Sequence, residues 1–142
     1  MAAWLADSVN KVVTYHRTTR EAAADILEHG VDISKSRIGS YGQGFYTATR
    51  TDPLFGPAEL AVAIRTRRPL VGDVEAVAAQ IDALMPRTYH GVPAAITPDT
   101  AAAIRLELLS LGYDGIIVLD GGGDETDYIV ALDASAVKVV LA

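Results

Sequence analysis

The chain has 142 residues, of which half are hydrophobic and 21% are charged, so an intrinsically disordered chain is excluded and one domain can bury its own core. Its net charge of −6 argues against binding to a phosphate backbone as the main task. The absence of cysteine excludes disulfide bonds, a thiolate nucleophile and a zinc–thiolate site, and we predict a single domain over residues 1–142.

A strand followed by a helix is predicted near the N-terminus. The β-branched and aromatic run over residues 12–16 favours the strand. Thr18, with Glu21 three residues later, fits a capping box for the helix, and Gly30 ends it. The buried face of this helix is expected to hold Ala23, Ile26 and Leu27.

The middle of the chain predicts a loop, two strands and a helix. Serine and glycine over residues 34–44 favour a loop, which leads into a strand at 45–47. Small and apolar residues over 59–67 fit either a strand or a helix start, and we favour the strand. After Asp73, apolar residues at helical spacing predict a helix that ends at Pro86.

The last third predicts a loop, a helix and three strands. Prolines favour a loop over residues 86–98, and helical spacing predicts a helix over 101–111 that Gly112 closes. The strands are expected to be adjacent and antiparallel over 115–120, 128–132 and 137–141. This mixed order indicates an α+β fold rather than regular βαβ alternation.

Two short segments carry residues that suit a binding site. His16 ends the first strand, where its side chain can face a cleft; alternatively it is a half-buried residue bonded to a nearby carbonyl. Phe45 and Tyr46 follow two glycines, so strand alternation would put one ring in the core and leave the other free to stack on a flat heterocycle. Gly44 would let a ligand or a backbone come close, although the glycines also fit a simple turn.

A small acidic cluster precedes the strand over 128–132. Asp127 stands directly before this strand and Glu125 shares its parity, so either carboxylate can face a site; the alternative is an exposed loop. The three histidines are widely separated and lack spaced carboxylate partners, so no metal is expected.

In this order, the segments resemble the three-part signature of the ADP-ribosyltransferase superfamily. The similar branch has a histidine, a tyrosine and an acidic residue on three core strands, and it includes diphtheria-toxin-like toxins and poly(ADP-ribose) polymerases. His16-Arg17-Thr18 looks like its His-x-Thr/Ser segment, and Gly42-Gln43-Gly44-Phe45-Tyr46 is similar to its Gly-x-Gly-aliphatic-Tyr segment. Asp127-Tyr128-Ile129-Val130 looks like the ending of small bacterial and phage members.

The resemblance implies split mixed β-sheets with flanking helices and an NAD cleft between them. It implies that His16 binds the adenosine ribose, that the backbone of Arg17 holds the nicotinamide amide and that Tyr46 stacks on the nicotinamide ring. Thr18 would assist at the ribose, or cap the helix instead. The full set of NAD-binding residues would be His16, Arg17, Thr18, Gly44, Phe45, Tyr46 and Tyr41.

The third catalytic residue beside His16 and Tyr46 is either Asp127 or Glu125, whose carboxylate would bind the hydroxyls of the nicotinamide ribose. The family usually has glutamate there. Many relatives also carry a second aromatic residue that closes over the nicotinamide. Position 57 is proline in this chain, so Phe55 is the nearest substitute, unless Tyr41 or Tyr89 closes the pocket from a loop.

The resulting expectation is a toxin-like mono-ADP-ribosyltransferase with NAD as co-substrate and release of nicotinamide. Its acceptor is open between a protein, a nucleic acid and a small molecule, and a toxin would also have an immunity or antitoxin partner. The alternatives are an NAD glycohydrolase, a catalytically weak NAD-binding or interaction domain, and an unrelated α+β module. Without a signal peptide or a membrane-length apolar run, we expect a soluble cytoplasmic protein without a membrane partner, or a delivered effector.

Overall fold

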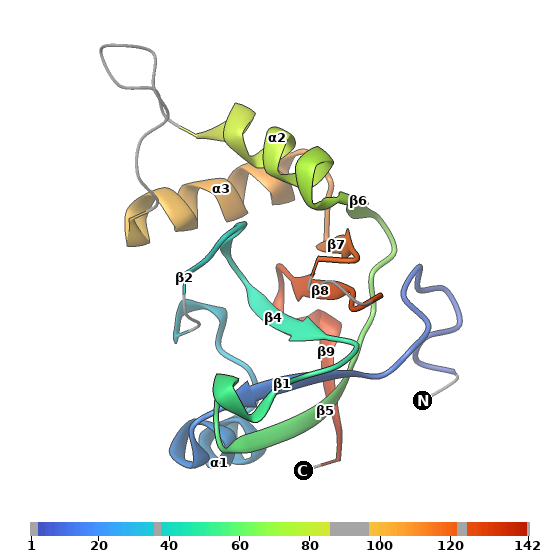
Figure 1. Ribbon diagram of the computed structural model, residues 1–142, viewed down its shortest axis with the longest axis vertical. Helices are drawn as coiled ribbons and strands as arrows, with labels where there is room; N and C mark the ends of the chain where they lie inside the picture. The colour runs from blue at the N-terminus through green and yellow to red at the C-terminus, as the bar shows by residue number, and fades with distance from the viewer. Residues whose placement is uncertain (1–2, 36–37, 86–96, 122–124, 142) are drawn as a thin grey trace.

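The computed structural model describes residues 3–35, 38–85, 97–121 and 125–141. It has the α+β composition that the sequence predicts, with three helices and a mixed seven-stranded sheet in the described part (Figure 1). The elements are β1 (Thr14–Thr18), α1 (Arg20–His29), β2 (Ile38–Gly39), β3 (Gly42–Gln43), β4 (Phe45–Ala48), β5 (Ala58–Ile64), β6 (Pro69–Asp73), α2 (Val74–Leu84), α3 (Pro98–Ser110), β7 (Gly115–Leu119), β8 (Tyr128–Ala131) and β9 (Val137–Leu141).

The strands of the large sheet follow the order β6-β7-β8-β4-β1-β5-β9, while β2 and β3 form a separate hairpin. β6 and β7 are parallel, and the other neighbours are antiparallel. The predicted antiparallel pairing of β7 with β8 is confirmed. The prediction that β9 lies beside them is wrong, because β4 already occupies the other edge of β8 and β9 pairs with β5 instead.

A seam nearly divides the sheet between β1 and β4. β1 shares five residue pairs with β5 but one pair, Tyr15 with Ala48, with β4. Two buried side chains supplement this pair: the hydroxyls of Thr14 and Thr47 lie 2.7 Å apart, and Thr47 donates to the carbonyl of Ile129 on β8 at 2.7 Å. The split sheets expected from the resemblance are therefore not observed: the Tyr15–Ala48 pair and these side-chain bonds join the strands into one seven-stranded sheet, which is narrowest at the seam.

Apolar side chains form a core on each face of the sheet. α2 and α3 cover one face of β6, β7 and β8 (Figure 1), and α1 packs on the other side of the fold near β5. Along β7, Ile116 and Val118 join the cluster under α2 and α3, whereas Ile117 joins the cluster that includes residues of α1 and β5. Burial on both faces explains why β7 is apolar throughout instead of alternating.

Most helix ends agree with the sequence, with one shift. Gly30 ends α1 with φ of 83°, and the Asp73 side chain caps α2. The predicted cap of α1 is wrong by one residue: Thr18 is still part of β1, and Thr19 accepts the capping hydrogen bond. Leu27, expected on the buried face of α1, is 52% exposed.

The predicted loop over 86–98 lies largely outside the described residues. Its last two residues belong to the start of α3, where the Thr97 side chain caps the helix and Pro98 is the first helical residue. The ambiguous segment over 59–67 forms β5, as favoured from the sequence.

Candidate functional site

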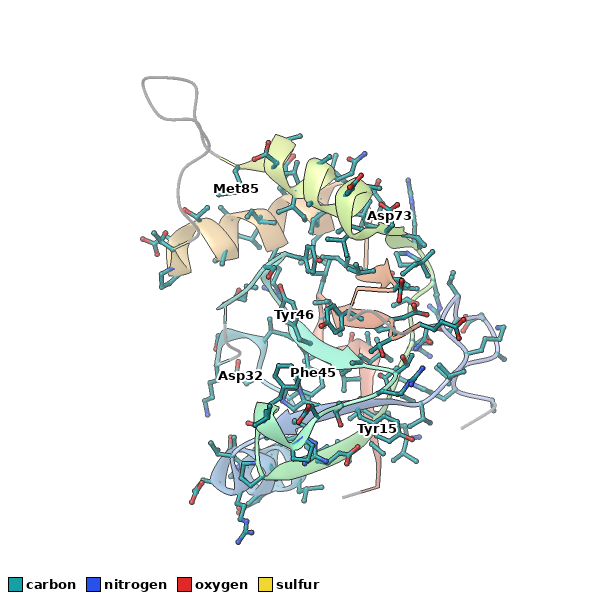
Figure 2. The ribbon with its side chains drawn as sticks, viewed as in Figure 1. Tyr15, Asp32, Phe45, Tyr46, Asp73 and Met85 are labelled. Atoms are coloured by element: carbon teal, nitrogen blue, oxygen red, sulfur yellow. The ribbon has the colours of Figure 1, made fainter. Side chains whose placement is uncertain are left out.

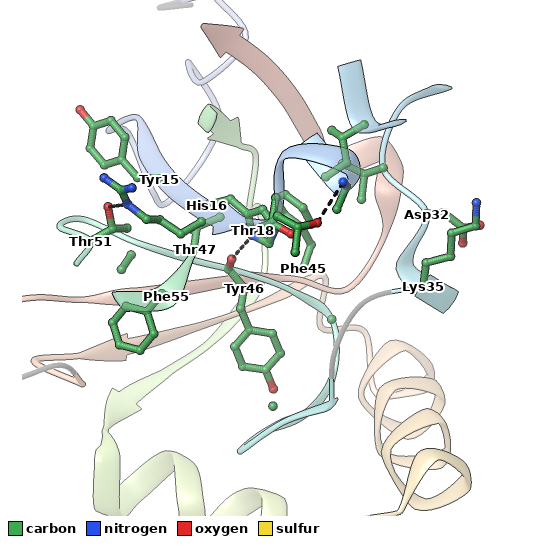
Figure 3. A pocket seen from close by; sticks show the side chains of 18 of the residues that line it. Tyr15, His16, Thr18, Asp32, Lys35, Phe45, Tyr46, Thr47, Thr51 and Phe55 are labelled. Carbon is green, nitrogen blue, oxygen red and sulfur yellow. Dashed lines mark hydrogen bonds between the residues drawn. The ribbon is translucent and has the colours of Figure 1, made fainter. Parts of the chain in front are cut away.

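A cavity of about 500 Å³ lies at the seam between β1 and β4 (Figure 3). The cavity is lined by β1, by α1 and the segment after it, by β4 and by the turn that follows β4. Gly39 of β2 and Tyr128 of β8 complete the lining. This volume is in the range of small-molecule sites. Where β1 and β4 separate, they are connected by side chains rather than by a ladder of backbone hydrogen bonds. The wider spacing of the two strands leaves room for a cavity within one sheet.

His16 crosses the seam from β1 toward β4. Its Nδ1 atom lies 2.7 Å from the carbonyl oxygen of Tyr46, and its ring stacks on Phe45 with ring centroids 4.1 Å apart. Burial lowers the pKa of His16, an effect that the hydrogen bond to the Tyr46 carbonyl opposes in part. The neutral imidazole therefore donates from Nδ1, which leaves Nε2 as a hydrogen-bond acceptor. Both interpretations of this residue hold, since it bonds a nearby carbonyl and also lines the cavity.

Phe45 and Tyr46 point to opposite sides of β4, as strand alternation predicts (Figure 2). Both residues line the cavity: Phe45 is 2% exposed and supports the ring of His16, whereas Tyr46 is half-buried. The Tyr46 hydroxyl donates to the Gly42 carbonyl at 2.7 Å and accepts from the Tyr41 N–H at 3.0 Å. Burial also raises the pKa of this phenol. The hydroxyl thus anchors the β2–β3 hairpin, and the ring is the part that can meet a ligand.

Gly44 permits a close approach, but the neighbour that approaches is part of the protein. A Cβ atom at this position would lie 2.5 Å from Cγ1 of Val130 and 3.1 Å from the carbonyl oxygen of Ala131 on β8. Gly44 also lines the cavity. The sequence predicted that either a ligand or a backbone approaches Gly44 closely. The structure shows close packing against strand β8.

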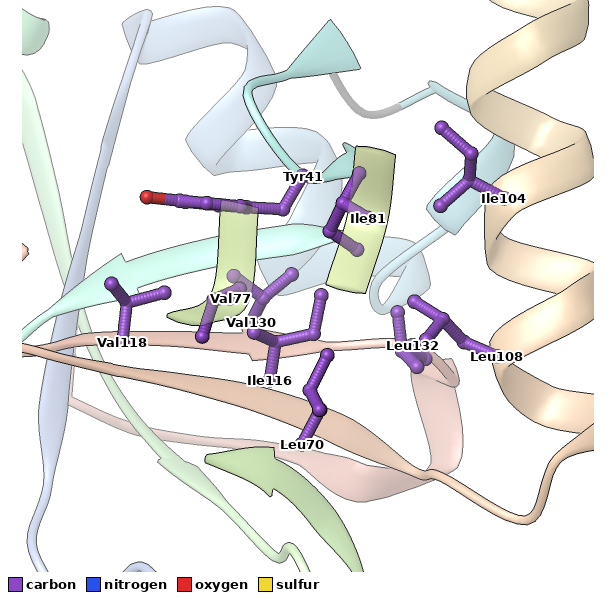
Figure 4. Packing of buried hydrophobic residues seen from close by; sticks show 10 residues of the cluster. All are labelled: Tyr41, Leu70, Val77, Ile81, Ile104, Leu108, Ile116, Val118, Val130 and Leu132. Carbon is purple, nitrogen blue, oxygen red and sulfur yellow. The ribbon is translucent and has the colours of Figure 1, made fainter. Parts of the chain in front are cut away.

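Arg17, Thr18 and Phe55 also line the cavity, as the sequence suggested for each of them. Tyr41 does not. Its ring is 8% exposed and packs in the cluster under α2 and α3 (Figure 4), so its contribution to the site is the backbone N–H that binds Tyr46. Tyr89 lies outside the described residues.

The two candidate acids lie at the β7–β8 turn and do not line the cavity. A side-chain oxygen of Asp127 accepts from the N–H of Asp120 at 2.8 Å. The backbone of Asp127 bonds to Thr49 just after β4, and its neighbour Tyr128 lines the cavity. Glu125 is exposed, with φ of 60°. The structure thus brings His16 and Tyr46 together, with Asp127 next to their cavity and Glu125 farther into the turn.

Three charged residues that the sequence did not single out line the α1 side of the cavity: Asp25, Asp32 and Lys35. Asp25 accepts from His29 at 2.9 Å and lies 3.8 Å from the Lys35 ammonium group. Asp25 lies three residues after the cavity-lining Ala22 and so shares its face of α1, but the sequence does not show that this face borders the cavity. Asp32 and Lys35 could not be predicted either, because their place at the cavity depends on the path of the chain after Gly30.

Comparison of the sequence with protein-family models gives no match, and comparison with curated proteins gives none either. Within the described ranges, no helix is long and apolar enough to cross a membrane. The same part of the chain contains no group of three or more His, Asp and Glu side chains arranged to hold a metal ion.

Proposed function

We propose that this chain is a mono-ADP-ribosyltransferase that transfers ADP-ribose from NAD to an acceptor and releases nicotinamide. The observation that carries the proposal is the shared cavity of His16 and Tyr46, which lie thirty positions apart in the sequence and on neighbouring strands at an opened seam. The third strand of the signature, β8, lies directly beside β4. Each of the three segments that resemble one family's signature therefore places a residue of the cavity lining on one of three consecutive strands, namely His16, Tyr46 and Tyr128, whereas Asp127 lies just outside the lining.

Binding of NAD follows from the groups that face the cavity. Nε2 of His16 is free to accept a hydrogen bond from a ribose hydroxyl, because Nδ1 already donates to the protein. The ring of Tyr46 offers a surface for the nicotinamide, and Phe55 is a second aromatic side chain on the same cavity. Arg17, next to His16 on β1, is within the lining, and its backbone would hold the nicotinamide amide.

The reaction breaks the bond between the nicotinamide nitrogen and C1′ of the ribose. The bonding electrons go to the pyridinium ring, which leaves as neutral nicotinamide, and positive charge builds on the ribose. A nucleophilic atom of the acceptor then bonds to C1′ and loses its proton. A carboxylate near the ribose lowers the barrier, because it stabilises this positive charge more strongly in the transition state than in bound NAD.

We assign that carboxylate to Asp127 in preference to Glu125. Asp127 is half-buried, precedes a residue of the cavity lining and is held to the end of β4 through Thr49. Its carboxylate would have to leave the Asp120 N–H in order to reach the ribose. Replacement of Asp127 by asparagine should lower turnover about 10²–10³-fold with little change in affinity, whereas Glu125→Gln should leave both unchanged.

A catalytically weak NAD-binding domain is the second candidate. Among the described lining residues the carboxylates are Asp25 and Asp32, on the α1 side, and no acid lines the end near Tyr46 and Tyr128. An NAD glycohydrolase would use the same bond cleavage with water as the acceptor.

Nicotinamide release and NAD binding should be measured on the purified protein, on His16→Ala and on Tyr46→Ala. His29→Gln is the matched control, because His29 is exposed on α1 and outside the cavity lining, and a glutamine amide can still donate to Asp25. Release that is lost in both site variants and kept in the control supports the transferase or glycohydrolase. Binding without release favours the second candidate, and a folded protein that neither binds nor cleaves NAD refutes both.

A further inference from the structure

The side chain of Arg17 is fixed by three partners close to the cavity. Its Nε donates to Thr51 Oγ1 at 3.2 Å, its Nη1 to the Gly56 carbonyl at 3.2 Å, and its Nη2 to Glu59 Oε2 at 3.0 Å. Thr51 Oγ1 in turn donates to the other carboxylate oxygen of Glu59 at 3.3 Å. The Arg17 side chain is 15% exposed, so these contacts are partly shielded from solvent. The role expected for Arg17 in NAD binding concerns its backbone and leaves this network unexplained.

The network holds both ends of the turn at residues 51–56, which follows β4. Inside the turn, Pro53–Phe55 forms a 3-10 helix that Asp52 caps by accepting from the N–H of Leu54. Gly56, with φ of 144°, packs so tightly on β1 that a Cβ atom there would lie 2.6 Å from the carbonyl oxygen of Thr18. The turn is therefore built against the strand that carries His16.

The turn at residues 51–56 presents two large, exposed apolar side chains, of which only one lines the cavity. Phe55 is 68% exposed and lines the cavity (Figure 3), whereas Leu54 is 91% exposed and is not part of the lining. An exposed ring at a cavity mouth has few protein contacts of its own to hold it. Its position depends on the backbone beneath it, and Arg17 fixes that backbone.

We propose that the Arg17 side chain is a positioning residue that holds the turn at 51–56 so that Phe55 faces the flat ring of the bound ligand. This proposal rests on the proposed function, since nicotinamide is the ring in question. A turn that is ordered before binding spares the ligand the entropic cost of ordering it. A guanidinium group suits the task because its planar N–H groups reach three acceptors in different directions, which an ammonium group on a flexible stem does less well.

The test is the KM for NAD in nicotinamide release, with Arg17→Ala, Phe55→Ala and the double variant. Loss of a stacked ring should raise KM about three- to tenfold, with kcat changed less than twofold. If Arg17 acts through Phe55, the double variant has the KM of Phe55→Ala alone. Leu54→Ala, a truncation in the same turn, should leave KM unchanged. Multiplied effects of the two site variants, or an unchanged KM in Arg17→Ala, would overturn the proposal.

A second pair of variants guards against a general folding defect in Arg17→Ala. Thr51→Val removes one acceptor at nearly constant volume, whereas Thr51→Ser keeps the hydroxyl. Amide hydrogen exchange of Phe55 and Gly56 is then measured in the ligand-free protein, where both N–H groups are hydrogen-bonded within the turn. Faster exchange in Arg17→Ala and Thr51→Val, but not in Thr51→Ser, supports the proposal, and unchanged exchange overturns it. Because this readout needs no NAD, a wild-type protein that fails to bind NAD would refute the proposed function and leave the role of Arg17 to be decided by exchange.

Discussion

Thr14 and Thr47 form a buried hydroxyl pair at the seam of the sheet, and removal of each hydroxyl should have a different cost. The two side chains are 0% and 4% exposed. Thr47 Oγ1 has one hydrogen, which it donates to the carbonyl of Ile129 on β8. Thr14 must therefore be the donor across the 2.7 Å contact with Thr47. The pair forms a directed chain from β1 through β4 to β8.

Valine at position 47 deprives the buried Thr14 hydroxyl of its acceptor and removes the donor to Ile129. We expect the free energy of unfolding to fall by about 1–3 kcal/mol, the cost of leaving buried polar groups unpaired. Valine at position 14 leaves the bond from Thr47 to Ile129 intact, so its cost should be about 0.5–1.5 kcal/mol. In the double variant the orphaned Thr14 hydroxyl is absent, and the loss should be no greater than in Thr47→Val alone.

Urea denaturation of the four proteins measures these differences. For a slope of about 2 kcal/mol/M, a loss of about 2 kcal/mol lowers the midpoint by about 1 M. Thr47→Ser keeps the hydroxyl and both of its hydrogen bonds, so it tests whether any substitution at position 47, rather than loss of the hydroxyl, lowers stability. The reasoning fails if the losses of the two single variants add in the double variant, or if Thr14→Val costs more than Thr47→Val.

Three further predictions concern single groups. Because burial lowers the pKa of His16 below its unfolded value near 6.5, the unfolded state binds more protons, so stability should fall as pH decreases below about 6.5. Denaturation midpoints between pH 7 and pH 5 should show this decline, and it should be weaker in His16→Gln. Gly39→Ala would overlap the hydroxyl end of the Tyr46 ring, so it should cost about 1–3 kcal/mol in a denaturation experiment and raise the KM for NAD. Equal stability and KM in this variant would show that the hairpin moves freely. Asp114→Ala leaves the N–H groups of residues 67 and 68 without their carboxylate partner, so the melting temperature should fall while the KM for NAD stays constant.

Much of the secondary structure could be predicted because its signals are local. The cap at Asp73 and the stop at Gly30 act through backbone geometry and hydrogen bonds within a few residues. The cap of α1 was misplaced by one residue because Thr18 and Thr19 are both good caps, and pairing with β5 extends β1 through the first of them. That pairing joins residues about forty positions apart, which no local pattern encodes.

For the candidate site, too, the local features could be predicted from the sequence and the long-range contacts could not. The sequence by itself determined the residue types, their order and, through strand alternation, that Phe45 and Tyr46 face opposite sides of one strand. It could not determine that a single backbone pair joins β1 to β4, because strand separation depends on how buried side chains pack across the seam. For the same reason it missed Asp25 at the cavity and the burial of the Tyr41 ring.

What the sequence alone determined about this protein is a set of local features: an α+β composition, most helix ends, and three segments that carry a histidine, an aromatic pair and an acid. The tertiary structure decided which of these features meet. It placed β9 beside β5, brought His16 against the Tyr46 carbonyl and left the Asp127 carboxylate on the β7–β8 turn. The physical reason is that backbone propensity acts over a few residues, whereas the burial of apolar faces selects partners across the whole chain.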